Sequence, residues 1–373
     1  MKAKRIKFIN KNKTVFFDTL KSRVDNYFKE NNISQYANGK MVFKSFVMLC
    51  IYFVPYALIM TQDMSLTSMW ICTLIMGLGL AGLGMCIMHD ANHNAYSSNR
   101  TINKIMGHSL NVVGGEAGNW ITQHNLLHHT YTNIFNMDKD IDDKGIMRLT
   151  PDSEYKKIQR FQTIYVFFFY SIMTLYWTTL KDFAQFYQFI RDGYHKEKGF
   201  DKFKTFFNIL IWKLFYWGYI IVLPVIVLDV TIFQVFIGFL SMHLVGGLIL
   251  SITFQLAHVV EKADFPKPDP KGNIYNEWAI HQLNTTADFA RDNWLISYYF
   301  GGLNFQAIHH LFPQVCHVHY PKIAPIVEQT AKEFGVKYLY HDTMREAFAS
   351  HMRLLSKLGK DEVTFSNFAD TAG

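Results

Sequence analysis

The chain has 373 residues, of which half are hydrophobic, 16% are aromatic and only 18% are charged. Soluble domains carry about a quarter charged residues, so this composition argues against a wholly soluble protein. Its mean hydropathy is nevertheless only slightly positive, which indicates apolar spans combined with a substantial polar part. Four cysteines without any Cys-x-x-Cys pair exclude a disulfide framework or a dithiol motif as the organising feature.

The positive charge is concentrated at the start of the chain. The formal net charge is +7, and residues 1–40 account for all of it, because their basic residues outnumber their acidic ones by seven. The rest of the chain is balanced, which does not favour nucleic acid as a partner. A basic segment directly before an apolar stretch is typical of the cytoplasmic flank of a membrane protein.

Four apolar stretches are each close to the length of about 20 residues that a helix needs to cross a hydrocarbon core of about 30 Å. They comprise residues 41–60, 66–88, 206–228 and 230–257. Short polar breaks separate the members of each pair, so we predict two transmembrane hairpins. The second stretch is rich in glycine, which lets helix backbones approach closely.

The distribution of lysine and arginine predicts the orientation. The two predicted hairpin tips contain neither residue, whereas the polar segments contain all of them except Lys44 and Lys213. The positive-inside rule then places both termini and both large polar segments in the cytoplasm. Residues 161–180 are almost as apolar as a span, but basic residues flank them at both ends, so we predict an interfacial or re-entrant helix there.

Half of the sixteen histidines fall into four groups in or beside the predicted cytoplasmic segments. The groups are His89 with His93, His124 with His128 and His129, His258 alone, and His309 with His310. A spacing of four residues places two imidazoles on one face of a helix. Each group taken singly is also typical of an ordinary surface. Two hairpins bring all four groups to the same face of the membrane, and we therefore predict a metal centre.

An all-imidazole set without cysteine suits zinc, iron, copper or nickel. A zinc site takes about three or four protein ligands, so eight histidines indicate two metal ions. The Glu-x-x-His pairs of the soluble dinuclear iron bundles do not occur in this sequence. We therefore predict a nitrogen-rich dinuclear iron centre at the membrane surface, which activates dioxygen beside an apolar chain delivered from the bilayer.

Three motifs resemble the histidine boxes of the membrane fatty acid desaturases, whose scaffold is similar to that of the membrane alkane and lipid hydroxylases. The motifs are HDANH at 89–93, HNLLHH at 124–129 and QAIHH at 306–310. The glutamine in the third box resembles that of the front-end desaturases, which act between an existing double bond and the carboxyl end, and of the related sphingolipid enzymes. The sequence has no His-Pro-Gly-Gly haem motif, so we expect no fused cytochrome b5 domain.

The resemblance implies an all-α integral membrane protein with four transmembrane helices in two hairpins and a cytoplasmic helical cap carrying a di-iron site. It favours a bacterial inner membrane over the endoplasmic reticulum. One desaturase domain is expected, built from a basic cytoplasmic arm (1–40), the first hairpin with the first box (41–93), a cytoplasmic segment with the second box and the interfacial helix (94–205), the second hairpin (206–258) and a cytoplasmic tail with the third box (259–373).

The resemblance also implies roles for individual residues. We expect the eight grouped histidines to bind two irons, with Gln306 and His281 near the site. His258 is preferred to His281 as a ligand because it ends the fourth span at the depth of His89. Candidates to accept a hydrogen bond from a ligating imidazole are Asp90, Asp138, Asp140 and Asp288. Candidates to line an acyl tunnel are Trp120, Trp278, Trp294 and Tyr298.

The implied reaction is the insertion of a cis double bond into a fatty acyl chain, carried by CoA or by a lipid, with dioxygen as co-substrate. A delta-6-like position is expected. Two electrons must come from an external donor, ferredoxin or cytochrome b5 with its reductase, because the sequence has no iron–sulfur, haem or dinucleotide motif. The basic arm with Lys156, Lys157 and Arg160 is the expected landing surface.

Two other readings stay open at this point. A hydroxylase or a sphingolipid desaturase on the same scaffold has the same histidine spacing, so only the product separates these enzymes. A metal transporter or sensor would place its ligands along a path at mid-membrane. Only His243 lies at mid-span in this sequence, which makes that reading the weaker one.

Overall fold

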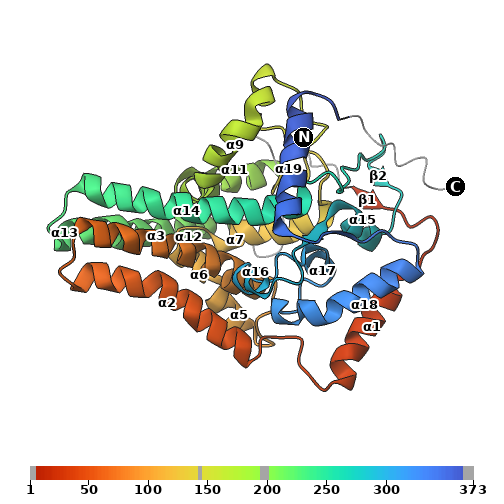
Figure 1. The fold of residues 1–373 in the computed structure, drawn as a ribbon, viewed down its shortest axis with the longest axis horizontal. Coiled ribbons are helices and arrows are strands. Elements are labelled where there is room, and N and C mark those ends of the chain that lie inside the picture. Colours follow the sequence, from red (N-terminus) through yellow and green to blue (C-terminus); the bar gives the residue numbers. More distant parts are fainter. Residues whose placement is uncertain (1–5, 142–144, 194–200, 364–373) are drawn as a thin grey trace. The chain divides into compact units, whose positions relative to one another are not determined.

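The computed structural model describes residues 6–141, 145–193 and 201–363, which are mostly helical (Figure 1). The start of the predicted basic arm, with Lys2, Lys4 and Arg5, lies outside the described residues, as do parts of the predicted cytoplasmic segments (142–144, 194–200 and 364–373). The chain forms two compact units. We call residues 36–121 with 168–252 the membrane unit, and residues 6–35, 122–167 and 253–363 the histidine-rich unit.

Four helical stretches are long and apolar enough to cross a membrane, which confirms the four predicted spans. They are Gly39–Thr61 (α2), Leu66–Asn92 (α3, η1 and α4), Lys202–Val227 (α12, η6 and α13) and Ile232–His258 (α14). Local capping explains where two of them begin. The side chain of Asn38 accepts hydrogen bonds from the first backbone N–H groups of α2, and Ser65 does the same for α3.

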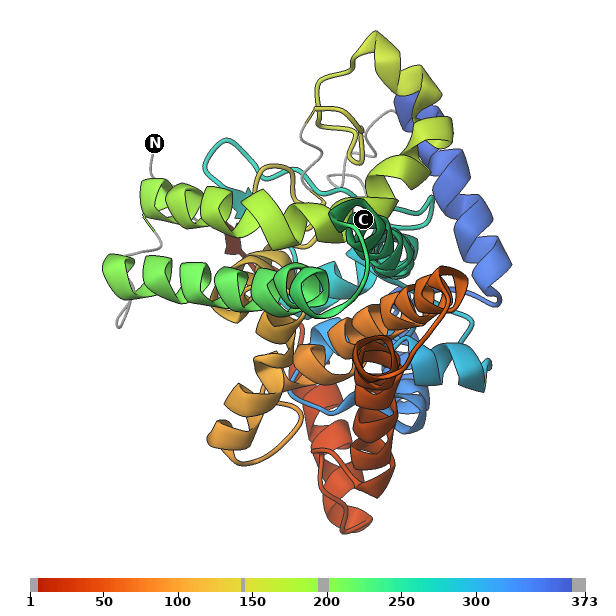
Figure 2. The same ribbon diagram turned by 90° about the vertical axis from the view of Figure 1, so that its left-hand side faces the viewer.

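Within the membrane unit, α2, α3 and α14 run beside one another, and Figure 2 shows them from the side of the turns that precede α3 and α14. Glycine makes this approach possible. A Cβ atom on Gly79 of α3 would lie 2.6 Å from the backbone nitrogen of Tyr52 on α2, and one on Gly77 would lie 2.6 Å from the carbonyl oxygen of Met242 on α14. The predicted close packing of the second span is therefore present.

The second span contains a break in helix type that the sequence did not predict. After α3 (Leu66–Gly82) comes a π-helical stretch, η1 (Leu83–Met88), and then a short α-helix, α4 (His89–Asn92). The third span is interrupted in the same way between α12 (Lys202–Trp217) and α13 (Leu223–Val227) by η6 (Gly218–Val222). Such π-helical insertions often lie next to functional sites.

Shorter helices complete the membrane unit: α5 (Arg100–Gly107), α6 (Ser109–Val112), α7 (Ala117–Trp120), α10 (Met173–Tyr176), η4 (Trp177–Lys181) and α11 (Asp182–Asp192). A buried ion pair links two of its helices. The ammonium group of Lys213 on α12 lies 2.5 Å from Asp182 and also donates to the carbonyl oxygens of Gly114 and Trp177 at 2.6 Å each. A buried charge with this many partners is compensated, which explains how a lysine is tolerated inside a span.

The apolar segment predicted at 161–180 is helical but bent. The helices Lys157–Ser171 (η3 and α9) and Met173–Asp192 meet at an angle of 51°. This geometry is that of a broken span or of a re-entrant segment, so the interfacial or re-entrant placement stays a prediction.

The histidine-rich unit contains short strands that the all-α prediction omitted. β1 (Lys7–Phe8) pairs in parallel with β2 (Asn273–Ile274), and β3 (Ala287–Phe289) pairs in parallel with β4 (Leu339–His341). Strands of two or three residues are too short to show an alternating pattern of side chains, which is why the sequence did not reveal them.

The predicted basic arm is folded into the histidine-rich unit. Its helix α1 (Phe16–Glu30) packs on α18 (Tyr320–Glu333), and its buried face shows a spacing of four residues. That face consists of Phe16, Leu20, Val24 and Phe28. The other helices of the unit are η2 (Ile121–His128), α8 (His129–Tyr131), α15 (Trp278–Thr285), α16 (Trp294–Tyr299), α17 (Gln306–Leu311), η7 (His317–His319) and α19 (Met344–Gly359).

We expect Gly79→Ala to destabilise the membrane unit by about 1–3 kcal/mol, because the new methyl group would meet the backbone of α2. Gly218→Ala is the matched control. Its Cβ would have no atom within 4 Å, so the helix should gain up to about 1 kcal/mol. Thermal unfolding in detergent measures both changes, and equal midpoints for the two variants would contradict the packing argument.

Candidate metal centre

The second histidine box lies on a helix of a different type from the expected one. Residues Ile121–His128 form a π-helix, η2, and α8 follows at His129–Tyr131. In a π-helix the backbone bonds connect residues five apart, so different side chains become neighbours. The Nε2 atoms of His124 and His129 lie 3.3 Å apart as a result. His124 and His128 nevertheless lie on one face, as predicted, because their rings stack at 5.0 Å. Only the type of helix differs from the expected one.

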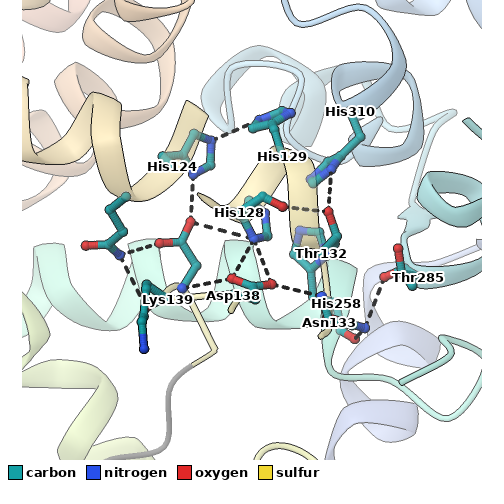
Figure 3. Close-up of polar contacts among 12 residues, drawn as sticks. His124, His128, His129, Thr132, Asn133, Asp138, Lys139, His258, Thr285 and His310 are labelled. Carbon is teal, nitrogen blue, oxygen red and sulfur yellow. Dashed lines mark hydrogen bonds and ion pairs between the residues drawn. The ribbon is translucent and has the colours of Figure 1, made fainter. Parts of the chain in front are cut away.

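Six buried histidines of the histidine-rich unit form one continuous cluster, part of which Figure 3 shows. At one end, the candidate ligand atoms of His128, His258 and His310 lie within 4.8 Å of one another. Their ring centroids are 4.7 to 4.9 Å apart. These three imidazoles come from η2, α14 and α17, so the fold gathers them from segments far apart in the sequence.

The other three histidines of the cluster adjoin this group. The ring of His129 is stacked on that of His310 at 4.3 Å and lies 4.6 Å from that of His309. His124 stacks on His309 at 6.0 Å. The structure thus brings together all of the predicted ligands that lie in this unit.

Two aspartate carboxylates form hydrogen bonds with the Nδ1 atoms of two imidazoles. Both carboxylate oxygens of Asp138 lie 2.9 Å from Nδ1 of His128, and Asp140 lies 2.7 Å from Nδ1 of His124 (Figure 3). An Nδ1–H that donates to a carboxylate leaves the Nε2 lone pair directed at the cluster. Nε2 of His128 is buried and has no hydrogen-bond partner among the residues that the structure describes. The lone pair of this nitrogen is available to bind a cation.

The charges around these imidazoles differ. Burial lowers the pKa of His124, and Asp140 offsets only part of that effect. Burial also acts to lower the pKa of His128, but Asp138 and Asp140 outweigh it and the pKa is raised. For Asp140, burial favours the neutral acid, yet His128 and His124 hold its pKa well below the usual range. The carboxylate of Asp140 therefore stays charged, and it favours positive charge beside His124 and His128.

The loop after the second box is organised by Asp138 and Asn133. Asp138 accepts hydrogen bonds from the backbone N–H groups of Asn133 and Asp140, both at 2.9 Å. The amide of Asn133 donates to the carbonyl oxygens of His258, Asp264 and Thr285 at 3.0 to 3.2 Å. Two residues of the sequence HHTYTN…D thus fix the second box against the end of α14.

The third box supplies a polar amide as well as imidazoles. Nε2 of Gln306 lies 3.2 Å from Nε2 of His258 and 3.5 Å from Nε2 of His310. Nδ1 of His310 lies 2.7 Å from Oε1 of Gln282 on α15, which also accepts a hydrogen bond from Thr132.

Gln282 and Tyr320 were not predicted from the sequence, and the hydroxyl of Tyr320 lies 3.1 Å from Nδ1 of His309. Both residues support an imidazole across a long separation in the chain. The only available signal for Gln282 was its position next to His281.

Asp288 and His281 were both expected near the site, and each makes contacts that the sequence did not indicate. Asp288 accepts the backbone N–H of Ala307 at 2.8 Å and the hydroxyl of Tyr338, so it positions the start of α17 instead of an imidazole. Burial raises its pKa to about 6. The ring of His281 packs on Phe8 at 4.9 Å, and burial lowers its pKa to about 3.

The first box lies in the membrane unit. The rings of His89 and His93 are 4.8 Å apart, on one face of the helix, and Trp120 lies 5.6 Å from each of them. Asp90 is buried on the same helix. Of the four residues predicted to line an acyl tunnel, Trp120 is thus the one that contacts the histidine box of the membrane unit.

The other three tunnel candidates lie in the histidine-rich unit. The indole N–H of Trp278 donates to the carbonyl oxygen of His129 at 3.1 Å, and its ring packs on Phe17. Trp294 is 74% exposed and Tyr298 is half-buried, both on α16. A lining role for these residues stays a prediction.

Comparisons with known proteins agree with the geometry. The model of the fatty acid desaturase family matches residues 65–341. The sn-1 linoleoyl-lipid 6-desaturase of Synechocystis sp. is 36% identical, with 96% of this chain and 99% of that protein aligned. The protein of the same name from Arthrospira platensis is 34% identical over 92% of both chains. An acyl-lipid (8-3)-desaturase of Physcomitrium patens is 36% identical over 93% of this chain and 72% of its own. The chain therefore belongs to the fatty acid desaturase family of membrane oxidoreductases.

Proposed function

We propose that this desaturase acts on an acyl chain of a membrane lipid and inserts a cis double bond between an existing double bond and the carboxyl end. One observation carries the proposal: relatives named linoleoyl-lipid 6-desaturases align over 92% and 99% of their length. The glutamine at the start of the third box, Gln306, supports the same front-end class. A lipid-linked chain is favoured over acyl-CoA because the three relatives described above are named for lipid-linked substrates.

We propose that the eight grouped histidines bind two irons. In the histidine-rich unit, the gathering of His128, His258 and His310 and the unpartnered Nε2 of His128 support this. The resemblance of HDANH to a histidine box extends the proposal to His89 and His93. When bound and reduced, iron supplies the activation of dioxygen that removal of hydrogen from an unactivated methylene requires. The aspartates orient the imidazoles, and burial keeps bulk water from the cluster.

The test of function is the fatty acid profile of a bacterial host supplied with linoleate. We expect a new double bond on the carboxyl side of the existing ones with the wild-type protein and none with His128→Ala, because that change removes one imidazole of the cluster. The half-buried His108, which directly follows α5, provides the control, since His108→Ala should keep the product. A hydroxylated product, or activity in His128→Ala, would contradict the proposal.

Asp138→Asn should lower iron affinity and turnover by about 10–100-fold, the usual effect of losing a carboxylate behind a ligating imidazole. The change keeps the size of the side chain but removes its charge. Asp152→Asn is the control, because Asp152 pairs with the exposed Lys267 and has no hydrogen bond or ion pair with a histidine of the cluster in the described structure. Iron per chain and turnover are measured on purified protein; unchanged values for Asp138→Asn would refute the orienting role.

We propose that a separate protein donates electrons to this enzyme. Removal of two hydrogens supplies two of the four electrons that reduce dioxygen to water, and the sequence has no motif to hold a carrier of the other two. We propose that ferredoxin or cytochrome b5 docks on exposed basic residues of the histidine-rich unit. On α1, Arg23 pairs with Glu333 and Lys21 pairs with Asp25.

A basic trio, Lys156, Lys157 and Arg160, is exposed and makes no ion pair with the described residues. It therefore presents more uncompensated charge to an acidic donor than the paired residues of α1 do.

Reversal of the trio to glutamate should slow donor-dependent turnover several-fold at low ionic strength, with a smaller loss as salt screens the charges. A matched triple reversal at exposed Lys271, Lys322 and Lys332 controls for the change in net charge. Membrane insertion and iron content should not change. Equal donor kinetics for the two triple variants would exclude the trio as the docking site.

A further inference from the structure

A cavity of about 330 Å³ lies within the membrane unit, at the end where the turns precede α3 and α14. Figures 1 and 2 show this end of the helices. Four spans contribute to its wall, together with the turn residues Leu228 and Val230. The cavity is distinct from the first histidine box, because its deepest residue on α3, Met76, precedes His89 by about 20 Å along the span.

The cavity is as deep as one leaflet. Its wall on α3 runs from Leu66 to Met76, and its wall on α14 reaches Met242, ten residues after the start of that helix. Ten helical residues rise about 15 Å. This is half of a hydrocarbon core of about 30 Å, so the depth equals the length of an acyl tail in the leaflet on that side.

The surface of the cavity is mainly apolar, although several polar residues line it. The hydroxyl of Tyr56 donates to the carbonyl oxygen of Tyr219 at 2.5 Å, and the indole N–H of Trp70 donates to Ser241 at 3.0 Å. The hydroxyl of Thr73 donates to the carbonyl oxygen of Trp70 at 2.7 Å. These donors are used within the protein, and a cavity holds water only where polar groups remain to bind it.

The cavity opens at the lipid-facing surface of the spans. Leu66, Trp70 and Ile237 at its rim are 51%, 44% and 39% exposed, whereas Met76 and Met242 at its floor are 1% exposed. The surroundings of exposed apolar residues on a span are acyl chains. The turns contain no lysine or arginine that would bind a phosphate head group, so recognition is left to the tail.

We propose that this cavity binds one acyl tail of a bilayer lipid, drawn from the leaflet at the turn end and distinct from the substrate chain that is oxidised. The wall of the cavity is fixed at Trp70. The indole N–H of this residue on α3 donates a hydrogen bond to Ser241 on α14 and so links the two helices. This binding is independent of the proposed reaction, so loss of the tail leaves the histidine boxes in place.

The test uses the full-length enzyme in phosphatidylcholine vesicles that contain an analogue with a photoactivatable diazirine at the end of one acyl tail. Labelled peptides are identified by mass spectrometry. Labelling at Met76 and Met242 reports the cavity, because annular lipids do not reach residues that are 1% exposed. Labelling at Leu58 and Ile226, which are 41% and 74% exposed, reports the annular lipid.

Val235→Phe and Val230→Phe each place a ring in the cavity and should lower the ratio of floor to annular labelling several-fold. Val227→Phe is the matched control, because Val227 is 56% exposed and does not line the cavity. All three variants should keep the fatty acid product, which separates this test from that of the proposed function. Absence of floor labelling, an unchanged ratio in both cavity variants, or crosslinks at the floor to a second copy of the chain would overturn the proposal.

Discussion

The hydrogen bond between His128 and Asp138 is the interaction on which the organisation of the histidine-rich unit depends. Both side chains are fully buried. A buried carboxylate is costly unless hydrogen bonds compensate it, and Asp138 obtains them from the imidazole and from two backbone N–H groups of its own loop. The chain from the second box to Asp140 is therefore folded around one carboxylate. The orientation of the imidazole and the path of the loop are consequences of the same requirement.

The π-helical form of η2 has a second consequence for the cluster. The rings of His124 and His128 stack at 5.0 Å, and the wider helix also brings His124 next to His129. His128 then points to His258 and His310. The motif HNLLHH thereby contributes imidazoles to two parts of the cluster. A π-helical stretch also precedes the first box, so the same device recurs where the second span reaches His89.

Some of these features were predictable and others were not. Hydropathy revealed the four spans because a membrane helix must satisfy its backbone within itself, so each span is a long apolar run. The histidines were found because their spacing is local. Gln282 was not, because its partner Thr132 is 150 residues away and nothing in either segment indicates the contact. The π-helices were missed because nothing in their residues distinguishes a π-helix from an α-helix.

The glutamine of the third box lies against two imidazoles of the proposed centre. The amide nitrogen of Gln306 lies 3.2 Å from Nε2 of His258 and 3.5 Å from Nε2 of His310, so these two nitrogens face the same polar group. His258 also makes a hydrogen bond with the backbone of Thr285, just as His128 is held through its Nδ1 by Asp138. A glutamine at this position therefore adds no further imidazole to the proposed ligand set. It contacts two that are already there.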